Sequence, residues 1–185
     1  MKVTITRAGA GVRKKKGLII VHTGNGKGKT TAALGLALRA SGCGMKVLML
    51  QFFKGKWKCG ELRSAPKLDN FEICPMGKGF TWESKDVEVD KAMVRNAWRA
   101  AQEKILSGNY DVVVLDEINY ALGYGFLPLD DVVEFLRKKP AMLHVVLTGR
   151  NAKPEIVEIA DLVTEMRQVK HPFEQGIGAQ RGIEF

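Results

Sequence analysis

Residues 23–31 read Thr23-Gly24-Asn25-Gly26-Lys27-Gly28-Lys29-Thr30-Thr31. An apolar run at residues 18–21 precedes this segment, and a run rich in alanine and leucine at residues 32–38 follows it. A strand, a glycine-rich turn and a helix in this order are typical of a phosphate-binding loop. Glycines allow backbone N–H groups to surround an anion, and the helix adds its unpaired N–H groups and the positive end of its dipole. The segment therefore predicts a nucleotide-phosphate site.

Two side chains of the loop have expected roles. Lys29 can reach phosphate oxygens, and the hydroxyl of Thr30 is placed to coordinate Mg²⁺. The loop is one residue shorter than the general pattern, because only three residues separate Gly24 from Gly28. The dinucleotide-binding fingerprint fits less well, because Lys29 occupies its last glycine position and no acidic residue follows near Gln51. The predicted nucleotide-binding residues are Gly24, Asn25, Gly26, Lys27, Gly28, Lys29, Thr30, Thr31 and, further along the chain, Arg150.

The composition is that of an ordinary globular protein. The chain has 185 residues, of which 45% are hydrophobic and 26% charged, and this length suits one domain with a single core. Of the net charge of +9, six positive charges lie in residues 1–16, which contain no acid. We expect residues 1–16 to be a flexible basic arm and residues 17–185 to be the nucleotide-binding domain. No aromatic residue interleaves with the arm, so nucleic acid is not the expected partner.

Cys43, Cys59 and Cys74 form no Cys-x-x-Cys pair and suit a reducing compartment. No apolar stretch is long enough to span a membrane, and no long apolar segment follows the basic arm as a secretory signal would require. The sequence therefore predicts a cytoplasmic protein without a membrane partner.

Apolar runs and amphipathic segments alternate along the chain. Further strands are expected at residues 46–52, 71–74, 110–117, 142–147 and 163–169. Helices are expected from residue 29 to the glycines near residue 42, and over residues 87–106, 130–137 and 154–162. In the longest helix, Trp98 belongs to an apolar stripe and is expected in the core. The alternation predicts an α/β fold: a single P-loop domain of the RecA-like kind, with a mostly parallel sheet covered by helices on both faces.

Polar residues follow the ends of several predicted strands. Parallel strands place ligands at their carboxyl ends, so we expect Gln51, Asp116-Glu117 and residues 148–150 to gather at the edge that carries the phosphate loop. Asp116 and Glu117 are the predicted Mg²⁺ ligands together with Thr30. One carboxylate holds the metal and the other serves as a ligand or a base, and the sequence leaves this division of roles open.

Five other side chains each allow more than one interpretation or carry a weaker expectation. Arg150 could clamp phosphate oxygens with its guanidinium group, or form a surface salt bridge. His22 and His144 show no metal-ligand spacing, and we expect both to be satisfied core or edge residues. Phe80 and Trp82 alternate in a glycine-rich segment, where they either pack as ordinary core or line a pocket for a large flat substrate.

Five segments of the chain together point to a family. They are Thr-Gly-Asn-Gly-Lys-Gly-Lys-Thr-Thr-Ala-Ala (23–33), Gln-Phe-x-Lys-Gly (51–55), Gly-Phe-Thr-Trp-Glu (79–83), Val-Val-Leu-Asp-Glu (113–117) and Val-Lys-His-Pro-Phe (169–173). In order and spacing they resemble the ATP:corrinoid adenosyltransferases of cobalamin synthesis, over residues 17–185. The shortened phosphate loop is normal in that family, and the basic arm is the part that matches least.

The resemblance implies transfer of the 5′-deoxyadenosyl group of ATP to the cobalt of a reduced corrinoid, with release of inorganic triphosphate. Cobalt in the +1 state is the nucleophile, so this reaction needs no general base. The resemblance also implies Lys29, Phe80, Trp82 and Glu117 as catalytic residues, with Phe80 and Trp82 crowding the lower face of the corrin. The implied partners are ATP with Mg²⁺, the reduced corrinoid as a substrate, an electron donor such as a flavoprotein, and a second subunit in a homodimer.

Two other functions remain open from the sequence. A RecA-like NTPase or switch would use Glu117 to activate water, and would release ADP and phosphate. A basic nucleic-acid-binding module regulated by ATP would show a salt-dependent affinity for DNA or RNA that is lost on deletion of residues 1–16.

Overall fold

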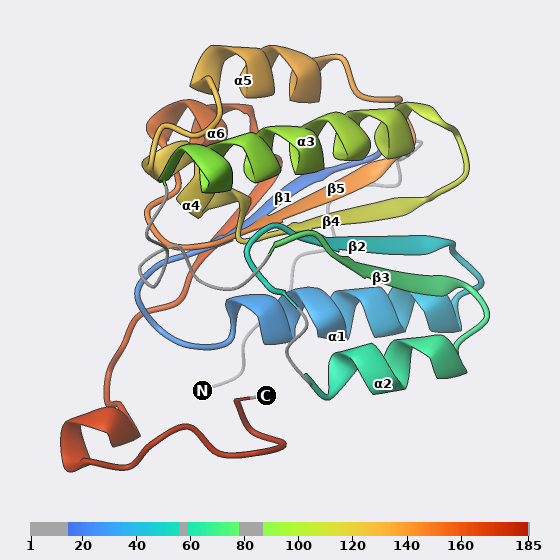
Figure 1. Ribbon diagram of the computed structural model, residues 1–185. Helices are drawn as coiled ribbons and strands as arrows, with labels where there is room; N and C mark the ends of the chain where they lie inside the picture. Colours follow the sequence, from blue (N-terminus) through green and yellow to red (C-terminus); the bar gives the residue numbers. More distant parts are fainter. Residues whose placement is uncertain (1–14, 56–58, 78–86, 185) are drawn as a thin grey trace, which may run out of the picture.

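Short apolar strands alternate with helices along the chain and assemble into one parallel sheet. A computed structural model describes residues 15–55, 59–77 and 87–184. The sheet has six strands in the order β3-β2-β4-β5-β1-β6, and every neighbouring pair is parallel (Figure 1). The strands are β1 (Ile19–Thr23), β2 (Val47–Gln51), β3 (Phe71–Pro75), β4 (Val112–Asp116), β5 (His144–Thr148) and β6 (Leu162–Glu165).

Helices cover both faces of this sheet. The helices are α1 (Lys29–Gly42), α2 (Glu61–Ser64), α3 (Val87–Leu106), α4 (Ile118–Gly123), α5 (Leu129–Arg137) and α6 (Pro154–Ile159), with 3₁₀ turns η1 (Ala65–Lys67) and η3 (Pro172–Gln175). Figure 1 shows α1 and α2 on one face, and α3, α4, α5 and α6 on the other. The predicted α/β fold with a parallel sheet covered on both faces is confirmed.

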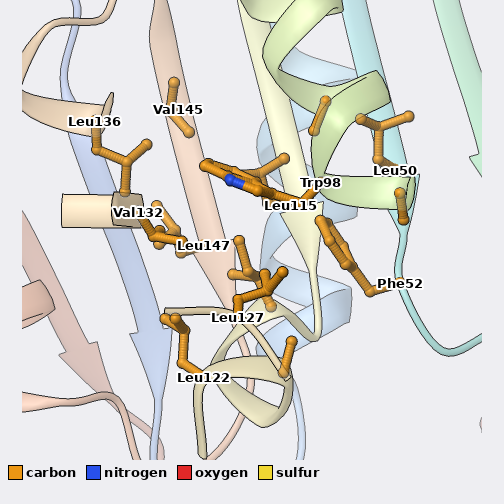
Figure 2. Packing of buried hydrophobic residues seen from close by; sticks show 14 of the residues in the cluster. Leu50, Phe52, Trp98, Leu115, Leu122, Leu127, Val132, Leu136, Val145 and Leu147 are labelled. Carbon is orange, nitrogen blue, oxygen red and sulfur yellow. The ribbon is translucent and has the colours of Figure 1, made fainter. Parts of the chain in front are cut away.

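The alternation of side chains along each strand produces two apolar cores. On one face, every second residue of the strands, such as Leu115 and Leu147, packs against α3 to α6, and Figure 2 shows Trp98 among them. Trp98 is buried and meets the ring of Phe135 edge-on at 5.3 Å, as its place in the apolar stripe predicted. On the other face, the alternate residues meet α1 through alanines such as Ala33 and Ala37, whose small side chains allow the helix to lie close to the sheet.

The strand order decides where the site lies. β5 is inserted between β1, which leads into the phosphate loop, and β4, which ends in Asp116. The register pairs Gln51 on β2 with Asp116 on β4, and Thr148 on β5 with His22 on β1. The polar residues that end these four parallel strands therefore line up along one edge of the sheet, as predicted.

Several expected boundaries differ from the structure by one or more residues, and three of them have a clear physical reason. The strand expected to end at Glu117 ends at Asp116, because Glu117 has a left-handed backbone (φ 68°) and precedes α4, a helix that the sequence did not predict. The helix expected over residues 154–162 ends at Ile159, because Ala160 is extended. The strand expected over residues 163–169 is β6, which ends at Glu165 because its partner β1 ends at Thr23 and turns into the phosphate loop.

The edge strand β6 is exposed, whereas the central strands β2 and β4 are fully buried. All four of its residues are exposed, and Leu162 is 48% exposed. The reason is its place at the edge of the sheet, where β1 is its one neighbour within the described residues.

The two histidines in the strands behave differently. His144 Nδ1 accepts a hydrogen bond from the Leu18 N–H at 3.2 Å, so this histidine is satisfied as expected. His22 is buried, and neither of its ring nitrogens has a hydrogen-bond partner among the described residues. Its position in β1 directs it to the α1 face, where the packed side chains are apolar, and burial lowers its pKa.

Cys43, Cys59 and Cys74 are free thiols. Within the described ranges, no group of three or more His, Cys, Asp or Glu residues is arranged to hold a metal ion by itself. The helices of the same ranges include none long and apolar enough to cross a membrane.

Candidate functional site

The phosphate loop adopts the shape that its glycines allow. Gly24 and Gly28 have positive φ angles of 93° and 106°, a region that favours glycine. Lys29 opens α1, and its buried Nζ donates hydrogen bonds to the carbonyls of Gly24 at 2.8 Å and Gly26 at 2.7 Å. Burial lowers the pKa of Lys29, while the charge of Glu117 acts in the opposite direction. The lysine therefore lies folded against the loop, at the amino end of the helix.

The loop also rests on the chain that follows β6, which the sequence did not predict. The Gly26 N–H donates to the Met166 carbonyl at 2.6 Å. A Cβ atom at Gly24 would lie 2.4 Å from the Met166 oxygen, and one at Gly26 would lie 2.7 Å from the Arg167 carbonyl carbon. Packing against this segment therefore requires glycine at both positions, in addition to any need for glycine in phosphate binding. No sequence pattern announces this contact, because the two segments are far apart in the chain.

Asp116 joins three elements at the edge of the sheet. It is fully buried at the end of β4, and its Oδ1 accepts hydrogen bonds from Thr30 Oγ1 at 2.9 Å and Thr148 Oγ1 at 2.8 Å. Thr148 in turn accepts a hydrogen bond from the Glu117 N–H at 2.8 Å. Thr30, Asp116 and Glu117, predicted together from the sequence, therefore lie close together, and Thr148 bridges them from β5.

Glu117 is the less satisfied of the two carboxylates. Its Oε2 is buried and has no hydrogen-bond partner among the described residues. Burial, and next the charge of Asp116, raise the pKa of Glu117 to about 7, although Lys29, Lys54 and Arg150 act in the opposite direction. A buried carboxylate oxygen without a partner, beside Asp116 and the Thr30 hydroxyl, is a set of hard oxygen donors that fits Mg²⁺.

A second group of polar residues lies beside Asp116; Gln51 was predicted at this edge of the sheet, whereas Lys54 and Glu61 were not. Lys54 Nζ donates to Glu61 Oε1 at 2.9 Å and lies 3.6 Å from Asp116 Oδ2. The buried Gln51 lies between the two carboxylates, and its Nε2 is 3.4 Å from an oxygen of each. Burial alone would lower the pKa of Lys54, but Asp116 and Glu61 outweigh it and the pKa is raised. Lys54 stands in a segment that the sequence singled out, yet only folding brings Glu61 to it.

Several of these residues line one cavity of about 590 Å³, although Gln51, Asp116 and Thr148 are not part of its wall. Its wall includes Lys27, Lys29, Thr30, Lys54, Glu61 and Glu117. Residues 182–184 line the cavity on another side, and Glu184 forms an ion pair with Lys27. Figure 1 shows this C-terminal segment leaving the sheet and returning toward α1.

Not all predicted residues reach this cavity. Asn25 and Arg150 are exposed and do not belong to its wall, although the charge of Arg150 is near enough to affect the pKa of Glu117. Phe80 and Trp82 lie outside the described residues. Thr31 does line the cavity, next to Thr30.

The fold resembles that of a known structure. The crystal structure of the flagellar accessory protein FlaH from Methanocaldococcus jannaschii superposes with a TM-score of 0.51, over 80% of this chain and 70% of that one. The two sequences are 14% identical, so this likeness concerns the fold alone.

Sequence comparisons identify the family. A family model described as ATP:corrinoid adenosyltransferase BtuR/CobO/CobP matches residues 15–185. A corrinoid adenosyltransferase from Sinorhizobium sp. is 49% identical, over 92% of this chain and 81% of its own. Those from Pseudomonas aeruginosa and Escherichia coli K12 are 45% and 44% identical, over 100% and 95% of this chain and 91% and 89% of their own. Because the family model matches nearly the whole of this chain, the chain belongs to the ATP:corrinoid adenosyltransferase family.

Proposed function

We propose that this protein transfers the 5′-deoxyadenosyl group of ATP to the Co(I) centre of a corrinoid and releases triphosphate, in the synthesis or salvage of adenosylcobalamin. One observation carries the proposal. In a member of this family, three lysines and three carboxylates line a single cavity at the carboxyl edge of the sheet: Lys27, Lys29, Lys54, Glu61, Glu117 and Glu184. This concentration of charge suits a triphosphate group bound with a divalent cation.

The proposed reaction is a nucleophilic substitution at the 5′ carbon of ribose. The electron pair of Co(I) forms the cobalt–carbon bond, the bond between C5′ and the phosphate oxygen breaks, and its electron pair leaves with the triphosphate. Cobalt is formally oxidised from +1 to +3, and no proton moves. The protein must therefore bind and orient the substrates and stabilise the leaving group, without a general base.

The phosphate loop would bind the phosphates, and the carboxylates of Asp116 and Glu117 would bind the metal. Lys29 and amides of the phosphate loop other than the Gly26 N–H, which is bonded to Met166, would bind the phosphates, and Arg150 would approach from the rim of the site. Thr30, Asp116 and Glu117 would hold Mg²⁺, whose charge neutralises part of the triphosphate when it is bound. Glu117 then acts through the metal, which would favour its ionised form.

The remaining features of the proposal come from the family. Phe80 and Trp82 would bind the corrinoid and ease reduction of its cobalt. An electron donor such as a flavoprotein would reduce the cobalt of the corrinoid to Co(I). Two copies of the chain would form a homodimer. Free thiols at Cys43, Cys59 and Cys74 are in keeping with a cytoplasmic location.

A single assay tests the function. The protein is incubated with ATP, Mg²⁺ and chemically reduced cobalamin, the visible spectrum is followed, and the phosphate product is identified. We expect an adenosylated corrinoid and triphosphate in equal amounts. The alternative from the sequence, an NTP hydrolase that uses Glu117 to activate water, is not favoured by the corrinoid adenosyltransferase relatives. ADP and phosphate in place of triphosphate would establish the hydrolase and exclude the transferase.

A further inference from the structure

Lys54 is a third lysine beside the phosphate loop, and the loop motif does not account for it. It follows β2, its side chain is only 19% exposed, and it lines the same cavity as Lys27 and Lys29. Its Nζ lies 2.9 Å from Glu61 Oε1 and 3.6 Å from Asp116 Oδ2. One ammonium group therefore sits between two carboxylates at the wall of the cavity.

The two carboxylates hold Lys54 unequally. Glu61 accepts a hydrogen bond of ordinary length, whereas the separation from Asp116 is that of a longer ion pair. The other oxygen of Asp116 faces Thr30, on the side where a divalent cation fits. A cation there would repel the ammonium group and compete with it for Asp116, so the contact with Glu61 is the one that persists.

An ammonium group held at one point still has donors to offer. It carries three N–H groups and Glu61 uses one, while the flexible side chain lets the group pivot. The other two lysines are engaged: Lys27 forms an ion pair with Glu184, and Lys29 donates to loop carbonyls. Lys54 is therefore well placed to meet phosphate oxygens in the cavity that it shares with the phosphate loop.

We propose that Lys54 is a ligand of the triphosphate group of ATP and of the leaving triphosphate, and that Glu61 is the positioning residue that tethers it. In the nucleotide-free protein Lys54 offsets the buried charge of Asp116. When the nucleotide binds with its metal, Lys54 turns from Asp116 to phosphate oxygens while Glu61 keeps its ammonium group at the wall. The inference rests on the proposed function, because breaking the C5′–O bond adds a negative charge to the triphosphate that Lys54 would stabilise.

The direct test is the binding of inorganic tripolyphosphate with Mg²⁺ to the whole protein, measured by calorimetry without corrinoid. Lys54→Met removes the charge and keeps the length of the side chain. It is expected to weaken binding by about ten- to a hundredfold, as for a hydrogen bond between charged groups. Lys54→Arg keeps the charge and is expected to recover most of that affinity. Glu61→Gln keeps the lysine and is expected to weaken binding by less than about tenfold, because only the tether is altered.

If Lys54 had only a structural role, Lys54→Met would not weaken the binding of Mg²⁺-tripolyphosphate. If Lys54 were only the counter-ion of Asp116, Lys54→Met would remove a competitor of the metal. The variant would then bind Mg²⁺-tripolyphosphate as tightly as the parent protein or more tightly, and this result would overturn the proposal. Where the single change prevents folding, the double change Lys54→Met, Glu61→Gln removes one charge of each sign, and the same loss of affinity is expected from it.

Turnover separates this inference from the proposed function. Starting from Co(I), Lys54→Met is expected to lower kcat more than it raises KM, because the charge on the triphosphate is larger in the transition state than in bound ATP. A parent protein that binds Mg²⁺-tripolyphosphate but forms no adenosylated corrinoid refutes the function and leaves the Lys54 assignment standing. An active parent whose Lys54→Met variant keeps full affinity refutes the Lys54 assignment alone.

Discussion

Glu117→Gln is expected to stabilise the nucleotide-free protein at alkaline pH and to have little effect on stability at acid pH. The pKa of Glu117 is raised from 4.5 to about 7 in the folded protein, so over this window the folded protein keeps a proton that the unfolded chain has released. Each pH unit of the window removes about 1.4 kcal/mol from the free energy of unfolding. Above pH 7 the ionised carboxylate therefore lowers the free energy of unfolding by about 3 kcal/mol. Glutamine has a similar shape but no charge, so the variant does not lose this stability.

The assay is urea unfolding of both proteins at several pH values between about 5 and 8, without nucleotide or metal. The difference in the free energy of unfolding should grow as pH rises and level off above the folded pKa. Asp116, Lys29, Lys54 and Arg150 are the charged groups that act on Glu117, and all are unchanged in the variant. Glu155→Gln, on the exposed side of α6, is the matched control for the loss of one carboxylate. A difference that stays constant over the whole pH range would refute the reasoning.

Three further predictions concern the site. Lys29→Ala should weaken MgATP binding by about tenfold or more and abolish turnover in a folded protein, since a charged donor is lost; unchanged affinity in calorimetry would remove the loop from the site. Thr30→Val should cost about 1 kcal/mol of stability, because its hydrogen bond to Asp116 is lost, and should raise the Mg²⁺ concentration needed for ATP binding; an unaltered Mg²⁺ titration would contradict its role as a ligand. The double change Phe80→Ala, Trp82→Ala should nearly abolish adenosylation from the Co(II) corrinoid with a mild reductant and largely spare adenosylation from chemically prepared Co(I). Equal losses from both starting states would mean that these side chains only shape the pocket.

The sequence was sufficient to predict the parallel sheet and the residues that meet at its carboxyl edge. Strongly apolar runs bounded by polar residues fix β2, β4 and β5, and the strand-end rule then brings Asp116 to the phosphate loop. The prediction from sequence was less reliable near the C-terminus, because the length of β6 depends on where its partner β1 ends. The start of α4 was missed because Glu117 adopts a left-handed backbone, which a glutamate rarely does.

The missing parts of the site are those made by contacts between distant segments. Lys54 belongs to a segment that the family resemblance included, but its pairing with Glu61 and Asp116 depends on how the chain after β2 folds back. The approach of residues 182–184 to Lys27 has no signal in either segment. Periodicity and spacing report on neighbours in the chain, whereas these contacts follow from tertiary packing.

The contact between the phosphate loop and the chain after β6 also bears on how this protein can be engineered. Gly24 and Gly26 leave no room for a Cβ atom beside Met166 and Arg167, and the Gly26 N–H is bonded to the Met166 carbonyl. A loop lengthened by one residue, to match the general phosphate-loop pattern, would have to occupy space that residues 166–167 already fill. A loop transplanted from another nucleotide-binding protein would therefore fit only together with a rerouted chain after β6, so that loop length and the path of that chain must be exchanged as one unit.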